Sequence, residues 1–284
     1  MIAVIEIPFD PVLHLGPLPV HWYGVAYVLA FIVGMQLATP FLRSRGISEQ
    51  TASSIFWWNI GIGLVGARLY YVIQQPDLSV FLRDSIQVIA VWQGGMAFFG
   101  AVMACLATTA VIAYRRRLPI WVLLDAAALF ATLPQAIGRL GNIVNGDILG
   151  APSTLPWAVR YTNPHTFAPS TTTSYQPANV YELLTSLLLF GMVLLILSRR
   201  PRVGTAGIAY VAGYAISQVL VFFTRSTEPV LLLGLKQAQL TALGVLVIGV
   251  PVLLMAWRRY PDAWADGAPQ PFAHAVEAPV STGA

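Results

Sequence analysis

Seven long apolar runs, separated by short polar segments, most constrain the fold of this 284-residue chain. A helix needs about 20 apolar residues to cross the hydrocarbon core of a bilayer. The chain is 57% hydrophobic and only 10% charged, so a single soluble core cannot absorb all of these runs. The sequence therefore predicts an all-α fold, a polytopic membrane protein with about seven transmembrane helices, the fourth of them short. The predicted spans are residues 22–42, 54–74, 92–114, 121–138, 180–197, 204–223 and 240–257.

Arginines gather at alternate ends of these runs. Clusters follow the first, third, fifth and seventh runs, at Arg43 and Arg45, at residues 115–117, at residues 199–202, and at Arg258 and Arg259. Because cytoplasmic loops carry an excess of basic residues, this pattern predicts an external N-terminus and a cytoplasmic C-terminus. A pI near 9.4 could also suit a nucleic-acid-binding protein. The basic residues share no amphipathic surface, so we expect no nucleic-acid partner.

The remaining segments divide the chain further. Residues 1–21 lack a basic start and contain several prolines, which predicts an extracytoplasmic segment rather than a cleaved signal peptide. Within the transmembrane domain of residues 22–257, the polar, proline-rich residues 150–177 predict an external head or lid. Residues 258–284 are rich in Ala, Pro and Gly without apolar periodicity, which predicts a disordered cytoplasmic tail. The single cysteine, Cys105, is expected to be a packed thiol in the third span.

Residues 138–147, Gly-Arg-Leu-Gly-Asn-Ile-Val-Asn-Gly-Asp, place charges and amides between apolar runs. An ionisable side chain at membrane depth costs roughly 3 kcal/mol or more unless it faces a cavity or a partner. This favours a binding or catalytic site at Arg139, Asn142, Asn145 and Asp147 over a purely structural role. The glycines here and at Gly150 predict a non-helical path, which a bilayer tolerates only inside protein or beside water.

Other polar residues occur near the predicted outer face. Tyr23 fits either an interfacial aromatic belt or a hydroxyl turned into a cavity. Arg68 fits either a side chain that extends to the headgroups or an anion-binding group. Gly94 and Gly95 allow close approach of a neighbouring helix or of a ligand.

Two further charges complete the candidate site. Glu182 lies near the start of the fifth span and should be protonated or paired with Arg68, Arg139 or Arg225. Arg225 ends the sixth span on the face that carries few other arginines. A phosphate headgroup would explain it, because guanidinium binds phosphate oxygens through two parallel hydrogen bonds.

These residues resemble the bacterial prolipoprotein diacylglyceryl transferase family over most of the chain, from about residue 15 to residue 243. The motifs that carry the resemblance are His21-Trp22-Tyr23-Gly24, Gly66-Ala67-Arg68-Leu69, Trp92 with Gly94-Gly95-Met96-Ala97-Phe98, residues 138–147, Pro156-Trp157, Tyr181-Glu182, and Arg225 followed by Ala238-Gln239. The resemblance implies an inner-membrane enzyme whose site faces the extracytoplasmic side. Its partners would be membrane lipid, phosphatidylglycerol and the lipobox cysteine of exported prolipoproteins.

The implied reaction forms a thioether and releases glycerol 1-phosphate, without a metal or an organic cofactor. The implied catalytic residues are Arg139, Arg225, Asp147, Tyr23 and Glu182. The implied substrate-binding residues are Arg68, Asn142, Asn145, Gly94, Gly95, Gly146 and Gln239.

The chain departs from the family pattern at several polar positions. Phe99 and Gln176 stand where the family has histidines, Gln93 replaces an aspartate, Asp147 replaces a glutamate, and Gln218 and Phe222 replace an arginine and a glutamate. Asp147, Glu182 and Tyr23 remain candidates for the base that activates the thiol. Two alternatives to full transferase activity stay open: an accessory paralogue that binds phospholipid or lipoprotein, and a transferase with a different headgroup or acceptor.

Overall fold

The computed structural model describes residues 4–16, 18–75, 77–84, 86–91, 94–225 and 228–259. They form two compact units. The first contains the described residues up to Ala38 and from Leu124 onward, and the second contains Thr39–Leu123. Helices α1 (Trp22–Ser44) and α6 (Ile120–Asn145) each cross this boundary.

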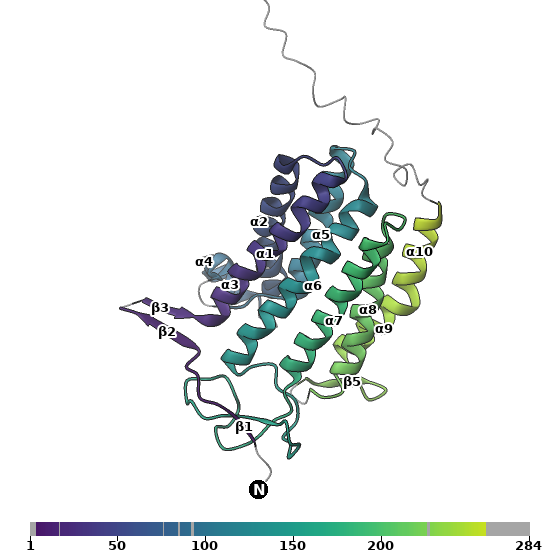
Figure 1. Cartoon of the computed structure of the whole chain (residues 1–284). Helices are drawn as coiled ribbons and strands as arrows, with labels where there is room; N and C mark the ends of the chain where they lie inside the picture. Colours follow the sequence, from purple (N-terminus) through teal and green to yellow (C-terminus); the bar gives the residue numbers. More distant parts are fainter. Residues whose placement is uncertain are drawn as a thin grey trace, which may run out of the picture. The chain divides into compact units, whose positions relative to one another are not determined.

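The first unit is built from long helices (Figure 1). Beside α1 and α6 it contains α7 (Ala178–Ser198) and α8 (Thr205–Val221). The last helix runs through α9 (Gln237–Gly244), a π-helical segment (Val245–Gly249) and α10 (Val250–Arg259). Helix α8 packs against both α7 and α9. Asp125 of α6 binds the first turn of α8, because its carboxylate accepts the main-chain N–H groups of Gly204 and Gly207 at 2.7 and 2.8 Å.

The second unit contains α2 (Glu49–Ile73), α3 (Ser79–Arg83), α4 (Ile86–Ile89) and α5 (Phe98–Arg115). Helix α2 begins at Ser48, whose hydroxyl accepts the N–H of Thr51. Helices α2 and α5 approach closely at two glycines: a Cβ on Gly100 would lie 2.4 Å from the carbonyl oxygen of Gly66.

Each of the seven predicted apolar runs overlaps a long helix of the described chain. Four of these helices are long and apolar enough to cross a membrane: Trp22–Ser44, Ile120–Asn145, Ala178–Ser198 and Gln237–Arg259. Phe99–Arg115 and Thr205–Val221 are shorter apolar helices. Helix α5 begins at Phe98, later than predicted. The predictions for Trp92 and Gln93 lie outside the described residues, as does the predicted tail beyond Arg259.

The prediction of a short fourth span was wrong, and the non-helical path allowed by the glycines begins only at Gly146. Helix α6 continues for 26 residues, through Gly138 and Gly141, and ends at Asn145. Gly141 serves close packing instead, because a Cβ there would lie 2.9 Å from the Cβ of Ala26 on α1. The left-handed turn comes only at Gly146, with φ +78°.

The all-α prediction was incomplete, because the described chain also contains three two-stranded sheets. Strand β1 (Ile5–Ile7) pairs in parallel with β4 (Val159–Tyr161). Strands β2 (Val12–Leu15) and β3 (Leu18–His21) form an antiparallel hairpin, as do β5 (Val230–Leu232) and β6 (Leu235–Lys236).

The segment predicted as a head or lid folds onto the end of α6. Ile7, Leu149, Val159, Tyr161 and Tyr175 form a small buried core. The Tyr161 hydroxyl donates to the carbonyl oxygen of Ile143 at 2.8 Å, and burial raises the pKa of Tyr161 to about 12, so the phenol stays neutral.

A second contact ties the N-terminal segment to the head. His165 Nδ1 lies 2.9 Å from Asp10 Oδ2, and this hydrogen bond, with one from the main-chain N–H of Val12, lowers the pKa of Asp10. The N-terminal residues and residues 150–177 therefore form one structured region.

Candidate active site

The last turns of α6 present a row of polar side chains. Arg139 Nη1 donates to Asn142 Oδ1 at 3.1 Å. Asn142 Nδ2 and Asn145 Nδ2 then donate to the two carboxylate oxygens of Asp147, each at 2.9 Å. The spacing of three residues places these groups on one helix face. The four residues predicted from this segment therefore form one hydrogen-bonded chain.

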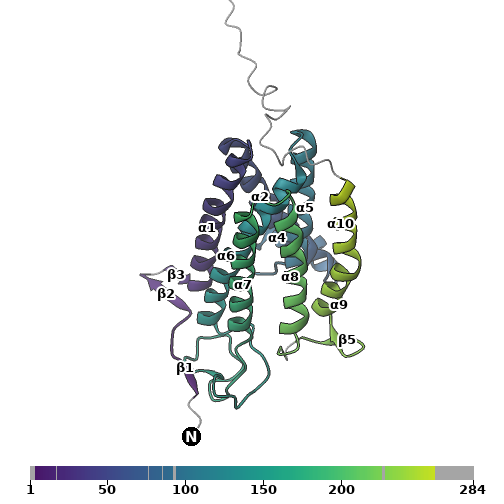
Figure 2. The same cartoon turned by 45° about the vertical axis from the view of Figure 1, so that its right-hand side comes forward.

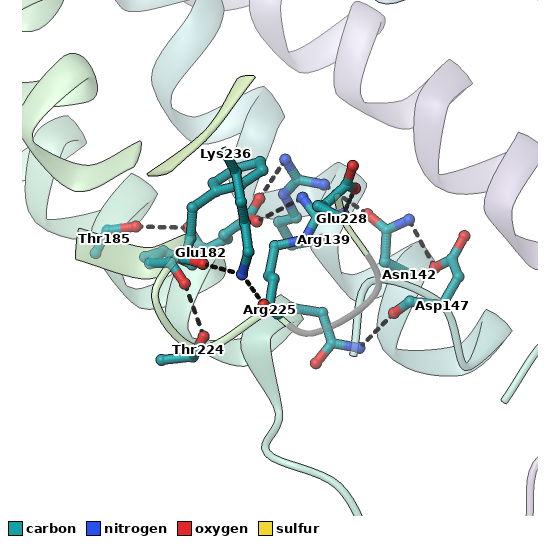
Figure 3. A network of polar contacts seen from close by, with 12 residues as sticks. Arg139, Asn142, Asp147, Glu182, Thr185, Thr224, Arg225, Glu228 and Lys236 are labelled. Carbon is teal, nitrogen blue, oxygen red and sulfur yellow. Dashed lines mark hydrogen bonds and ion pairs between the residues drawn. The ribbon is translucent and has the colours of Figure 1, made fainter. Parts of the chain in front are cut away.

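Glu182 lies between two arginines, as predicted for Arg139 and Arg225 (Figure 3). Its Oε2 is 2.5 Å from Arg139 Nη2, and its Oε1 is 3.6 Å from Arg225 Nη1. The Glu182 side chain is only 2% exposed, whereas those of Arg139 and Arg225 are 22% and 13% exposed. A carboxylate this deeply buried needs ionic partners, and two guanidinium groups supply them.

The ion-pair cluster keeps unused hydrogen-bonding capacity. Arg225 Nε is buried and has no hydrogen-bond partner among the described residues, and neither Glu182 oxygen has a hydrogen bond of regular geometry there. Buried donors of this kind are rare, and each needs an explanation. An anionic ligand between the two arginines would use the free donor.

Hydrogen bonds from Lys236 and Gln239 hold the loop that carries Arg225 in place. Lys236 Nζ donates to the carbonyl oxygens of Phe222, at 2.7 Å, and of Arg225. The Gln239 amide accepts the N–H of Lys236 and donates to the carbonyl oxygen of Val219, both at 3.0 Å. Gln239 is only 1% exposed, so in this structure it joins the start of α9 to α8.

The immediate surroundings of the Arg225 guanidinium include an acid and an aromatic ring. Arg225 Nη2 lies 3.0 Å from Glu228 Oε1. The guanidinium also lies 4.5 Å from the ring centroid of Phe222, where the family pattern has a glutamate. The aromatic face of Phe222 therefore adds a cation–π contact to the ion pairs of Arg225.

Sequence reasoning missed Lys236, Glu228, Asn179 and Tyr214. Asn179 Nδ2 donates to the carbonyl oxygen of Asp147 at 3.1 Å, and Tyr214 lies close enough to Arg139, Glu182 and Arg225 to interact with them electrostatically. One sequence signal was present: Lys236 is the only lysine in a chain with 16 basic residues. The sequence around Glu228, Asn179 and Tyr214 gave no indication that these residues belong to the site.

Tyr23 lies against α6 at the same site. A Cβ on Gly141 would come 3.2 Å from the Tyr23 Cα. The Tyr23 hydroxyl donates to that of Tyr27 at 3.0 Å, and the ring is close enough to Asp147 and Arg139 to interact with them electrostatically. Tyr23 therefore lies beside the polar end of α6.

A head residue also reaches the helix that carries Glu182. Trp157 Nε1 donates to the hydroxyl of Tyr181 at 2.7 Å, which joins two of the motifs singled out in the sequence. The head is thereby attached to the start of α7.

Arg68, Gly94 and Gly95 come together in the second unit. The buried Arg68 guanidinium donates to the carbonyl oxygens of Val88 at 3.0 Å, Gly94 at 2.6 Å, Gly95 at 2.9 Å, and Gln87. The alternative that Arg68 extends to the lipid headgroups was wrong, because its guanidinium donates to main-chain carbonyl oxygens of the second unit. The positive φ angles of Gly94 and Gly95, +83° and +76°, allow both carbonyls to face the arginine.

Comparison with known proteins agrees with these motifs. The family model described as "Prolipoprotein diacylglyceryl transferase" matches residues 11–255. The chain belongs to this family.

Three relatives named phosphatidylglycerol–prolipoprotein diacylglyceryl transferase place the chain within it. The protein from Frankia alni is 34% identical over 94% of this chain and 71% of the relative. The one from Frankia casuarinae is 35% identical over 83% of this chain and 58% of the relative. The one from Nitrobacter winogradskyi is 31% identical over 91% of this chain and 92% of the relative. The family model, which matches residues 11–255, includes all of α6, α7 and α8 and the loops that carry the rest of the site.

Proposed function

We propose that this chain transfers the diacylglyceryl group of phosphatidylglycerol to the lipobox cysteine thiol of an exported prolipoprotein. The products are a thioether and glycerol 1-phosphate. The observation that carries this proposal is the approach of Arg139 and Arg225 to one carboxylate, that of Glu182. Two guanidinium groups held this close suit a phosphodiester, whose oxygens accept paired hydrogen bonds.

Glu182 holds the two arginines in place before the lipid binds. When the phosphate enters, the unused Nε of Arg225 and the partly exposed face of Arg139 donate to its oxygens. Asn142 and Asn145 lie next to Arg139 and orient the headgroup. These donors are already positioned and partly shielded from water, so they stabilise the charge that develops on the departing phosphate.

The chemical step is a displacement at carbon. The cysteine thiolate attacks the carbon of the diacylglyceryl group that bears the phosphate ester. A carbon–sulfur bond forms at this carbon, and its bond to the phosphate oxygen breaks. The electron pair of that bond leaves with glycerol phosphate. The thiol proton passes to a base, for which we propose Asp147. Glu182 is held between two arginines, whereas Asp147 is half-exposed and its carboxylate accepts hydrogen bonds from the neutral amides of Asn142 and Asn145.

We also propose seven membrane spans with the site on the extracytoplasmic side of a bacterial inner membrane. Helices α6 and α8 end at the site, and α7 and α9 begin there. Residues 199–202 follow α7, and Arg258 and Arg259 end α10. Both groups lie at the opposite end of the first unit (Figure 2). The positive-inside rule assigns that opposite end to the cytoplasm.

The test uses the purified full-length chain in phosphatidylglycerol nanodiscs with a lipobox peptide. The expected result is a peptide mass increase equal to one diacylglyceryl group, absent when the cysteine is replaced by serine or when the discs contain phosphatidylcholine alone. Bound phosphatidylglycerol without a mass increase would instead indicate the accessory paralogue. Transfer from another headgroup only would indicate the altered transferase.

A further inference from the structure

The β5–β6 hairpin exposes four consecutive apolar side chains close in sequence to residues of the candidate site. Val230, Leu231, Leu232 and Leu233 are 60%, 58%, 59% and 86% exposed. From Pro229 to Leu235 the sequence contains no charged or hydrogen-bonding side chain. A soluble surface seldom carries so many adjacent exposed aliphatic side chains.

The turn of this hairpin makes the feature more unusual. Leu232 pairs with Leu235, so Leu233 and Gly234 form a two-residue turn, with φ values of +52° and +76°. Turns of this kind favour asparagine or aspartate followed by glycine, since both central residues need positive φ. Leucine is unfavourable there both for its backbone and, in water, for its side chain. An apolar environment would remove the second of these penalties.

The position of the hairpin indicates which apolar environment it meets. It leads directly into the Gln237–Arg259 helix, a candidate span of which only 6% is buried within the protein. In both views the hairpin extends sideways beyond the start of α9 rather than back over the other helices (Figures 1 and 2). The exposed hairpin therefore passes directly into a helix that itself faces lipid if it spans the membrane.

We propose that the β5–β6 hairpin is an interfacial anchor whose leucines insert into the outer leaflet of the membrane. The insertion is shallow, because a two-stranded sheet has unpaired main-chain groups that must remain hydrated. The side chains reach the boundary between headgroups and acyl chains, as apolar faces of interfacial segments do.

The anchor also sets the depth of the candidate site in the membrane. This second step rests on the proposed function. The hairpin is bracketed by the site residues Arg225 and Glu228 on one side and Lys236 and Gln239 on the other. Fixing its depth in the leaflet fixes the height of the Arg225 loop. The guanidinium then lies at the level of the lipid phosphates, where a phosphatidylglycerol headgroup enters.

A depth measurement tests the anchor without requiring turnover. In a Cys105→Ser background, Leu233→Cys is labelled with a polarity-sensitive fluorophore and studied in nanodiscs that hold one protein each. Leu188→Cys on α7 is the lipid-facing control, and Thr171→Cys in the head is the water-facing control. The Leu233 probe should be quenched by nitroxides at the headgroup end of the acyl chain, and less by nitroxides near its terminus. The proposal would be overturned if the Leu233 probe were quenched like the Thr171 probe. It would also be overturned if the Leu233 probe became shielded from water only after a signal peptide was added.

An activity measurement tests the consequence for the site. Leu233→Asn removes the apolar side chain and relaxes the turn, so the variant should be at least as stable in detergent as the parent. In nanodiscs its apparent KM, expressed as the mole fraction of phosphatidylglycerol, should rise about tenfold, with kcat little changed. In detergent micelles the KM should match the parent. Phe167→Asn, at a 64% exposed apolar residue of the head, should change neither value.

The two measurements separate the possible failures. A shallow Leu233 probe with no transfer by any variant would retain the anchor and reject the transferase. Normal transfer with an unchanged KM in Leu233→Asn would reject the role of the anchor at the site.

Discussion

Glu182 Oε2 lies 2.5 Å from Arg139 Nη2, where α7 begins beside the last turns of α6. The same carboxylate faces Arg225 with its other oxygen. One buried negative charge thus holds two positive charges, one on α6 and one in the loop that follows α8. In the proposed function, Glu182 keeps both arginines in place and a lipid phosphate takes the donors that it leaves unused.

Replacing Arg139 by lysine should remove most of the transferase activity. An ammonium cannot reproduce the paired hydrogen bonds of a guanidinium, so kcat/KM should fall about a hundredfold or more, as when one preorganised donor to a developing anion is lost. Arg160→Lys is the matched control, because Arg160 pairs with Glu6 on the surface of the head. Both variants are assayed by peptide mass shift. Equal activity in the two variants would contradict the assignment of the phosphate site.

Glu182 and Arg139 should be energetically coupled in folding. Glu182→Ala leaves two partly buried guanidinium groups without their shared partner, so the free energy of unfolding should fall by up to about 3 kcal/mol. Arg139→Met combined with Glu182→Leu should destabilise the protein by less than the sum of the single changes. Unfolding of Glu182→Ala, Arg139→Met, Glu182→Leu and the double variant in the same detergent measures these differences. Strict additivity would mean that the ion pair contributes nothing to folding.

Phe99→His should bring little gain in rate if Asp147 is the base. Asp147→Asn should then lower kcat about a hundredfold or more near neutral pH, whereas Asp147→Glu, which keeps the charge, should retain more activity. Pre-steady-state transfer at several pH values separates the chemical step from lipid binding. A hundredfold gain in Phe99→His would show that the missing histidine limits this chain and that Asp147 is not sufficient.

Lys236 should resist amine-reactive reagents in the folded protein. It is the only lysine, it is 9% exposed, and its ammonium donates to two main-chain carbonyls. Intact mass after brief acetylation should show modification of the N-terminal amine alone, with a second acetyl group only after unfolding. Rapid double modification of the native protein would contradict the buried position.

The positioning role of Lys236 has a kinetic signature. Lys236→Met removes both hydrogen bonds to the Arg225 loop and should lower kcat about tenfold, because a misplaced donor weakens transition-state stabilisation more than lipid binding. Lys236→Arg should restore part of this loss. A purely structural lysine would instead lower the amount of folded protein without changing kcat per folded molecule.

The linear pattern of residues was sufficient for the helices, because apolar runs of bilayer length permit few other structures. The prediction was inaccurate at α6, where the span was expected to end at Gly138 and the glycines were expected to allow a non-helical path. Glycine lowers helix propensity only modestly, and contact with α1 at Tyr23 and Ala26 outweighs that cost. Strands β1 and β4 escaped prediction because they lie about 150 residues apart in the sequence and pair only in the folded chain.

For the site, the order of residues was enough to identify Arg139, Asn142, Asn145, Asp147, Glu182 and Arg225 as candidates, because charges and amides among apolar helices need partners. Which partners they take was decided by packing. Glu182 could have paired with any of three arginines, and Lys236 showed no functional pattern at all. Both outcomes depend on how α6, α7, α8 and α9 lie against one another, and ion pairs between residues distant in the chain exist only in that arrangement.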